Sequence, residues 1–159
     1  MTANLIFLLN LISTWYMVGL IWMVQIVHYN LFNRVGVDAF AYYESEHNRL
    51  ITPIVGFPML IEIGTAFGLI WITPTFLPRS AAWLGLGLVM VIWISTVTLQ
   101  IPAHQRLLDG FDQNTYERLV SSNWIRTVGW TARGILLAYY AALMMDRLRL
   151  VKRFCLSLC

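Results

Sequence analysis

Two ionisable residues, Glu62 and Arg133, stand inside long apolar segments of this 159-residue chain. An ionised side chain in hydrocarbon costs at least about 2.5–3.5 kcal/mol, so each is expected to face a protein interior. Both lie at a similar depth in their segments, which predicts that they meet as an ion pair near mid-membrane. In one interpretation the pair fixes the register of two helices. In the other, Glu62 is a ligand or proton acceptor that the arginine tunes.

Further polar side chains follow the spacing of single helix faces. The groups are Gln25 and His28; Thr96, Gln100 and His104; and Asn123, Arg126, Trp130 and Arg133. Residues at this spacing share one side of a helix, so each group is expected to point into the same interior. The predicted catalytic residues are Glu62, His104, Arg126 and Arg133, and the predicted substrate- or cofactor-binding residues are Gln25, Tyr43, Gln100, Asn123 and Trp130. The two arginines would hold an anionic or quinone oxygen.

All three histidines, His28, His47 and His104, belong to the same predicted membrane side. As metal ligands together with the Glu62 carboxylate they would suit iron, copper or zinc, and histidine also ligates haem. No two of them stand three or four residues apart, so such a site would have to assemble from separate elements. The alternative for each histidine is a hydrogen-bonded position at the membrane interface.

The composition indicates the environment of these residues. Hydrophobic residues make up 58% of the chain and charged residues 12%, against about half and about a quarter in soluble domains. Residues 1–159 are therefore predicted to form a single multi-pass membrane domain, an all-α four-helix bundle. The net charge of +3 does not indicate a nucleic-acid partner, because the positive charges sit in loops and at the C-terminus.

Four apolar segments are long enough to cross about 30 Å of hydrocarbon as helices. We place them at about 5–27, 51–73, 81–101 and 124–145, with the third ending at Pro102. The two longer connections are predicted to carry amphipathic surface helices at about 39–50 and 115–122, lying flat on the membrane.

The spacing of residues within the two surface helices predicts their orientation and their start. Phe40, Tyr43, His47 and Leu50 would form the inward stripe of the first helix, with Glu44 and Glu46 falling elsewhere. Asn114 stands three residues before Glu117, which is the spacing of a capping box at the start of the second.

The two halves of the chain weakly resemble each other, because similar residues follow in the same order in each. Ile21-Trp22 and Ile92-Trp93 are each followed by a Gln and a His, then an Arg, a Tyr-Glu pair and a new span containing Val-Gly. This order fits a 2+2 parallel internal repeat, of a kind that builds central sites in membrane proteins. A chance likeness between apolar helices is the alternative.

The charges next to the spans indicate the orientation. Lys and Arg are equal in number on the two sides, but a tight basic cluster, Arg147, Arg149, Lys152 and Arg153, follows the last span. Positively charged segments favour the cytoplasmic side, so both termini are predicted to be cytoplasmic.

The stretch from Thr96 to Arg133 resembles the small four-span membrane proteins related to anthrone oxygenases. The resemblance rests on Leu99-Gln100-Ile101-Pro102-Ala103-His104 and on Asn123-Trp124-Ile125-Arg126-Thr127, together with the layout of the spans. Gln100 and His104 stand where that family usually has asparagines flanking the proline. The resemblance implies oxidation of an aromatic, quinone-like substrate, with these two residues and with Asn123 and Arg126 at the site.

We therefore predict a membrane oxidoreductase, redox or oxygenase-like, that acts on a quinone-like or aromatic molecule near one membrane face. The sequence contains no P-loop, GxGxxG, CxxC or GxSxG motif. The expected partners are the lipid bilayer, a hydrophobic small molecule such as a quinone, and a second copy or a membrane complex. One alternative is a non-catalytic membrane subunit that binds haem, metal, lipid or a partner protein. A small proton-coupled transporter is another.

Overall fold

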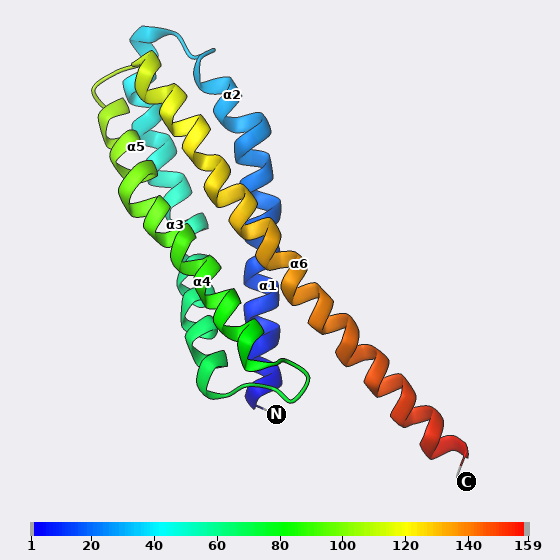
Figure 1. The fold of residues 1–159 in the computed structure, drawn as a ribbon. Coiled ribbons are helices and arrows are strands. Elements are labelled where there is room, and N and C mark those ends of the chain that lie inside the picture. The colour runs from blue at the N-terminus through cyan, green and yellow to red at the C-terminus, as the bar shows by residue number, and fades with distance from the viewer. Residues whose placement is uncertain (1, 158–159) are drawn as a thin grey trace.

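The computed structural model describes residues 2–157, with side chains described as far as Arg147 and at Arg149. Its elements are α1 (Thr2–Met23), η1 (Val24–His28), α2 (Tyr29–Phe32), α3 (Val37–Trp71), α4 (Arg79–Ser95), η2 (Thr96–Gln100), α5 (Ile101–Leu107) and α6 (Gln113–Ser157). They join into four long rods (Figure 1), each long and apolar enough to cross a membrane. The predicted all-α four-helix membrane bundle is confirmed.

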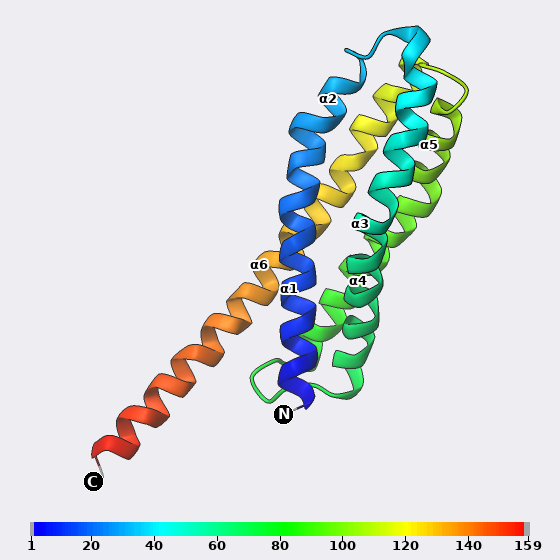
Figure 2. The same cartoon turned by 180° about the vertical axis from the view of Figure 1, so that it is seen from behind.

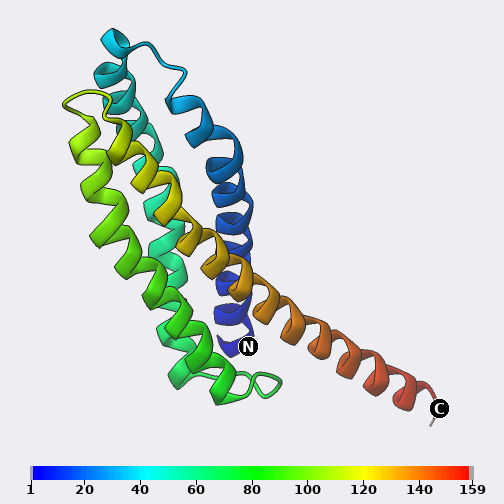
Figure 3. The ribbon, with the colours of Figure 1, turned by 45° about the horizontal axis from the view of Figure 1, so that its top comes forward.

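The four rods are longer than a bilayer requires. They contain 29 to 35 residues each, whereas about 20 suffice to cross the hydrocarbon, so their ends extend beyond it. The first rod begins and the last rod ends at the same end of the bundle (Figure 1). The connections α2–α3 and α5–α6 lie at the other end (Figure 3), which we call the histidine end. The cytoplasmic location of the termini stays a prediction.

The first and third rods are each interrupted by one π-helical turn. In the first rod η1 separates α1 from α2, and in the third rod η2 separates α4 from α5. Ile21-Trp22 precedes one turn and Ile92-Trp93 precedes the other, so the two halves share this irregularity as well as the order of their residues. Asn30 donates to the backbone oxygen of Ile26 at 2.7 Å and so binds a carbonyl of the first turn. Such turns add a residue to the helix and are frequent at functional sites.

The surface helices predicted at 39–50 and 115–122 are not separate elements. The first is the beginning of α3 and the second is the beginning of α6, and both helices run on into the membrane without a break. Packing explains the difference, because Phe40, Tyr116 and Leu119 are buried in the core at the histidine end. The two segments therefore stand upright in the bundle and do not lie on the membrane.

The third rod also continues past its predicted end. Pro102 lies in the first turn of α5, directly after the π-helical turn η2, where the regular hydrogen-bond ladder of the helix is already interrupted. The helix therefore runs to Leu107, and it carries His104 on a regular turn of α5.

The start of α6 is capped by Asp112 and not by the predicted Asn114. A carboxylate oxygen of Asp112 accepts a hydrogen bond from the backbone N–H of Thr115 at 2.8 Å, which satisfies one of the unpaired donors of a helix start. Hydrogen bonds from the hydroxyl and backbone of Thr115 hold the pKa of Asp112 below its usual value. Gly110, with φ of 131°, makes the preceding turn.

The rods pack around a main core near the histidine end and around a smaller core toward the other end. The main core gathers buried residues from all four rods, including Met17, Phe32, Ile92 and Trp130. A Cβ on Gly129 would lie 2.9 Å from the Ile92 side chain, so this glycine lets α6 approach α4. The C-terminal part of α6 projects away from the bundle in both side views (Figure 1, Figure 2).

Candidate functional site

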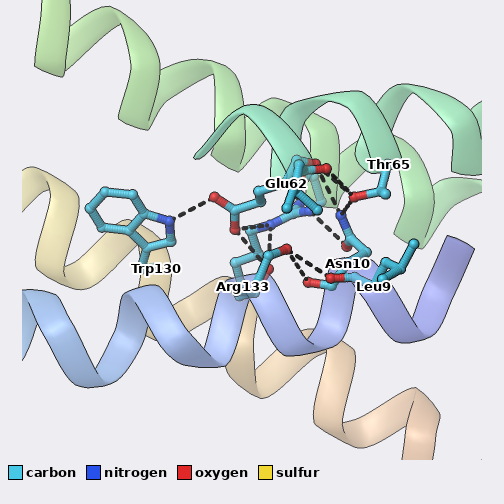
Figure 4. A network of polar contacts seen from close by, with 10 residues as sticks. Leu9, Asn10, Glu62, Thr65, Trp130 and Arg133 are labelled. Carbon is cyan, nitrogen blue, oxygen red and sulfur yellow. Dashed lines mark hydrogen bonds and ion pairs between the residues drawn. The ribbon is translucent and has the colours of Figure 1, made fainter. Parts of the chain in front are cut away.

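The predicted ion pair between Glu62 and Arg133 is present in the middle of the bundle (Figure 4). Nε of Arg133 donates to Oε1 of Glu62 at 2.9 Å, and both side chains are 1% exposed. The Thr14 hydroxyl donates to the same carboxylate oxygen at 2.7 Å. The indole N–H of Trp130 donates to the other oxygen at 2.8 Å. Both oxygens of the Glu62 carboxylate therefore have partners.

The remaining donors of Arg133 are also occupied. One terminal nitrogen donates to the backbone oxygen of Gly85, and the other donates to Oδ1 of Asn10 at 2.8 Å. Asn10 in turn donates to the backbone oxygen of Glu62 at 3.1 Å and to the Thr65 hydroxyl at 2.8 Å. We call Asn10, Thr14, Glu62, Trp130 and Arg133 the central network. It links α1, α3, α4 and α6 and is fully hydrogen-bonded, which favours the structural interpretation of the pair.

The three histidines gather at the histidine end, as predicted, but their carboxylate neighbour is Glu44 and not Glu62. Nδ1 of His104 and Oε1 of Glu44 are 2.5 Å apart, and Glu44 is 0% exposed. Nε2 of His28 and Nδ1 of His47 are 2.9 Å apart, and the rings of His47 and His104 are 5.3 Å apart. The prediction of Glu62 as a ligand beside the imidazoles is wrong, because its carboxylate is held within the central network.

Glu44 was missed because the inward stripe of its helix was given the wrong phase. Glu44 follows Phe40 by four residues and precedes His47 by three, and both spacings keep residues on one face of a helix. Leu50, predicted to face inward, is 54% exposed instead. Asn48 donates to Oε1 of Glu44 at 3.2 Å. Oε2 of Glu44 has no hydrogen-bond partner among the described residues.

Two of the predicted binding residues, Gln25 and Asn123, tie helices together. The Asn123 amide donates to Oε1 of Gln25 at 2.8 Å, and the Gln25 amide donates to the backbone oxygen of Val120 at 3.2 Å. These bonds join η1 to α6. Neither side chain is on the wall of the cavity described next.

A cavity of about 220 Å³ lies between the central network and the histidine end. Its polar lining residues are Tyr29, His47, Asn48, Thr52, Thr96, Gln100, His104 and Arg126, and its remaining lining residues are mostly apolar, among them Met17, Val55, Met59 and Trp93. Thr52 and Ile101 are exposed, so the wall includes the lipid-facing surface of α3 and α5. Compact apolar cavities with a few polar groups are typical of small-molecule sites.

Arg126 and Tyr29 form the polar end of this cavity together with His104. The Tyr29 hydroxyl and Nε2 of His104 are 3.1 Å apart, and the Arg126 guanidinium lies beside the same hydroxyl. Arg126 also stacks over the Trp130 ring, 5.2 Å from its centre. This stacking joins the cavity to the central network.

The other predicted binding residues lie at different distances from the cavity. Gln100 lines it, but its amide is already bonded to Ser95 and Ser122, at 3.0 Å each. Tyr43 is half-buried and packs against Phe32. Tyr43 and Trp130 are not among the lining residues. Tyr29 and Trp93, which line the cavity, were not predicted.

In the part of the chain that the structure describes, no three residues among His, Cys, Asp and Glu are grouped to hold a metal ion. The closest approach of two imidazole nitrogens is that of His28 and His47. No protein-family model matches the chain, and no curated protein or solved structure matches it either.

Proposed function

We propose that this protein is a membrane oxidoreductase that takes a flat aromatic ketone from the bilayer and oxidises it with dioxygen. The observation that carries the proposal is the position of His104. Its ring lies on the wall of an apolar cavity, between the buried carboxylate of Glu44 and the hydroxyl of Tyr29. An imidazole held in this way by a carboxylate is the usual arrangement of a general base.

The hydrogen bonds assign a role to each nitrogen of His104. With Nδ1 protonated and donating to Glu44, Nε2 is free to accept from the Tyr29 hydroxyl, and this tautomer follows from the two partners. Tyr29 also lines the cavity. In the proposed reaction Tyr29 takes a proton from the bound molecule while its own proton passes to His104. Glu44 stabilises the imidazolium that forms.

Arg126 supplies the positive charge for this step. It is 6% exposed, lines the cavity and lies beside the Tyr29 hydroxyl. Removal of a proton from a methylene group that is conjugated with a ketone through the aromatic rings places negative charge on the ketone oxygen. A fixed guanidinium in an apolar cavity stabilises that charge strongly.

The proposed reaction converts a methylene group beside an aromatic ring into a carbonyl group: R₂CH₂ + O₂ → R₂C=O + H₂O. The carbanion formed by the first proton transfer gives its electrons to dioxygen, and a carbon–oxygen bond forms. His104 returns the proton to the resulting peroxide. Loss of the second hydrogen with cleavage of the O–O bond then releases water. The resemblance of residues 96–133 to proteins related to anthrone oxygenases supports this choice of chemistry.

The test is oxygen uptake by the purified protein in lipid nanodiscs, with anthrone as the probe and the carbonyl product measured by chromatography. We expect Glu44→Gln and His104→Gln to lower the rate on the order of 10²–10⁴-fold, the usual contribution of general acid–base catalysis. Glu46→Gln is the matched control, because Glu46 lies near Glu44 on α3 and pairs with Arg49 at the surface.

Two results would contradict the proposal. Unchanged rates in both test variants would remove His104 and Glu44 from the reaction. Tight binding of the probe without oxygen uptake in the wild-type protein would instead support the alternative of a non-catalytic binding subunit.

Metal binding is a separate part of the proposal. The 2.9 Å separation of the His28 and His47 nitrogens supports a role for these two residues, and iron, copper, zinc or haem would be bound through imidazole. Elemental analysis and a visible spectrum of the purified protein test it. Stoichiometric metal that is lost in His28→Gln would support this role, and metal retained in that variant would contradict it.

A further inference from the structure

Two hydrogen-bond donors of cavity-lining residues lack a partner. Nε1 of Trp93 and Nε of Arg126 are both buried, and neither meets an acceptor within the described part of the chain. Both residues line the same cavity. An unpaired buried donor costs about 1–3 kcal/mol. A molecule that brought acceptor atoms to these two nitrogens would remove that cost.

The two residues stand at different depths of the bundle. Gly129 of α6 lies at the level of Ile92, because a Cβ at Gly129 would lie 2.9 Å from the Ile92 side chain. Ile92 is the residue before Trp93. Arg126 comes nearly one turn before Gly129 in α6, which at 1.5 Å per residue is about 4.5 Å nearer the histidine end. Trp93 follows Ile92 by one residue toward the histidine end, so the backbones of Trp93 and Arg126 differ in level by about 3 Å. Two separate acceptor atoms on one ligand can span that difference.

The chemistry of the two donors limits what they can recognise. The indole of Trp93 and the guanidinium of Arg126 donate hydrogen bonds and accept none. Gln100, the neighbouring amide, is occupied by Ser95 and Ser122. Carbonyl oxygens satisfy both donors without bringing a new donor that would itself need a partner.

We infer that Trp93 and Arg126 recognise two carbonyl oxygens of a single aromatic ligand, and that Trp93 sets the preference of the cavity for a diketone over a monoketone. The identity of the cavity as the substrate site rests on the proposed function.

The test compares the wild-type protein with Trp93→Phe, which keeps an aromatic ring and removes the N–H. The matched control is Trp83→Phe, because Trp83 is also in α4 and is 58% exposed. The probes are 2-methyl-1,4-naphthoquinone, with two carbonyl groups, and 1-tetralone, with one. Binding is measured by titration calorimetry in detergent without oxygen, so that turnover does not contribute.

We expect Trp93→Phe to weaken naphthoquinone binding about tenfold, the order expected for one lost hydrogen bond in a buried site, and to change tetralone binding less than about twofold. Equal losses for both probes would mean that Trp93 only fills space, and this would overturn the inference. Unchanged naphthoquinone binding in the variant, or none in the wild type, would overturn it too. Selective loss without oxygen uptake in the separate assay would contradict the proposed reaction and leave this recognition intact.

Discussion

The central network and the histidine end both bury charged groups, but they complete their hydrogen bonds differently. Glu62 and Arg133 have a partner for every charged atom. Toward the histidine end, Oε2 of Glu44 and Nε of Arg126 have none among the described residues, and Arg126 lines the cavity. Buried polar atoms that all have hydrogen-bond partners hold the helices together. Buried polar atoms without partners beside a cavity can instead bind an additional molecule. We therefore infer that the central network stabilises the bundle, and we propose that the cavity binds a ligand.

The largest effect is expected from breaking the central network. Arg133→Met leaves Glu62 buried without its ion-pair partner, which is expected to cost about 3–5 kcal/mol. Unfolding in mixed detergent micelles, followed by tryptophan fluorescence, measures the loss. The double variant Glu62→Leu/Arg133→Met removes both charges and should recover much of the stability. Arg149→Met is the surface control, because Arg149 is 78% exposed and 3.8 Å from Asp146. A loss of similar size in the control would contradict the assignment.

The second effect is expected on binding alone. Gly56→Leu places a side chain into the cavity that Gly56 lines, and no atom stands within 4 Å of the Cβ position there. We expect at least about a tenfold loss of naphthoquinone affinity, equivalent to about 1.4 kcal/mol, with little change in stability. Gly64→Leu adds the same group on the exposed side of α3 and should bind normally. Equal affinity in both variants would place the ligand elsewhere.

A smaller effect tests the hydrogen bonds that join η1 to α6. Asn123→Ala removes the 2.8 Å hydrogen bond to Gln25, and interhelical bonds of this kind contribute about 0.6 kcal/mol on average in membrane proteins. We expect a stability loss of that order in the micelle assay, and unchanged ligand affinity. Asn114→Ala, at an exposed position, is the control. Loss of ligand binding in Asn123→Ala would return Asn123 to the binding residues predicted from the sequence.

The smallest effect concerns Asp112 at the start of α6. Its pKa is below the ordinary 3.8 because Thr115 donates hydrogen bonds to it. A lowered pKa in the folded state adds stability that is fully present above 3.8 and is lost as the pH falls through the lower folded value. Asp112→Asn should keep much of the cap and remove this part of the pH dependence. Thermal unfolding between pH 7 and pH 3 measures it, and identical curves for both proteins would contradict the role.

The sequence predicted the central pair because depth in an apolar segment is a simple count. Glu62 and Arg133 lie at similar depths, and the cost of burying one charge requires the other. The four rods could be predicted from the long apolar segments, because few structures other than helices can cross a lipid bilayer. Asn10 and Thr14, which complete the network, were not predicted, because neutral polar residues in an apolar helix carry little information about their partners.

The histidine end was predicted less well because it depends on helix phase and on irregular turns. A stripe drawn through Phe40, Tyr43 and Leu50 excluded Glu44, although a shift of one residue includes it. The π-helical turns change the phase of the residues that follow them, so counting along the first and third rods could not place His28 or His104 relative to a neighbour. Trp93 has an unpaired N–H only because of its surroundings in the fold.

The most direct test of the division between the two regions is photolabelling with an aryl azide derivative of naphthoquinone, followed by mass spectrometry of the labelled peptides. Labels are predicted on residues that line the cavity, such as Met59, Trp93 and Thr96, and excess unlabelled naphthoquinone should prevent them. Labels confined to lipid-facing residues such as Trp71 and Ile135, insensitive to competition, would contradict a binding site in the cavity.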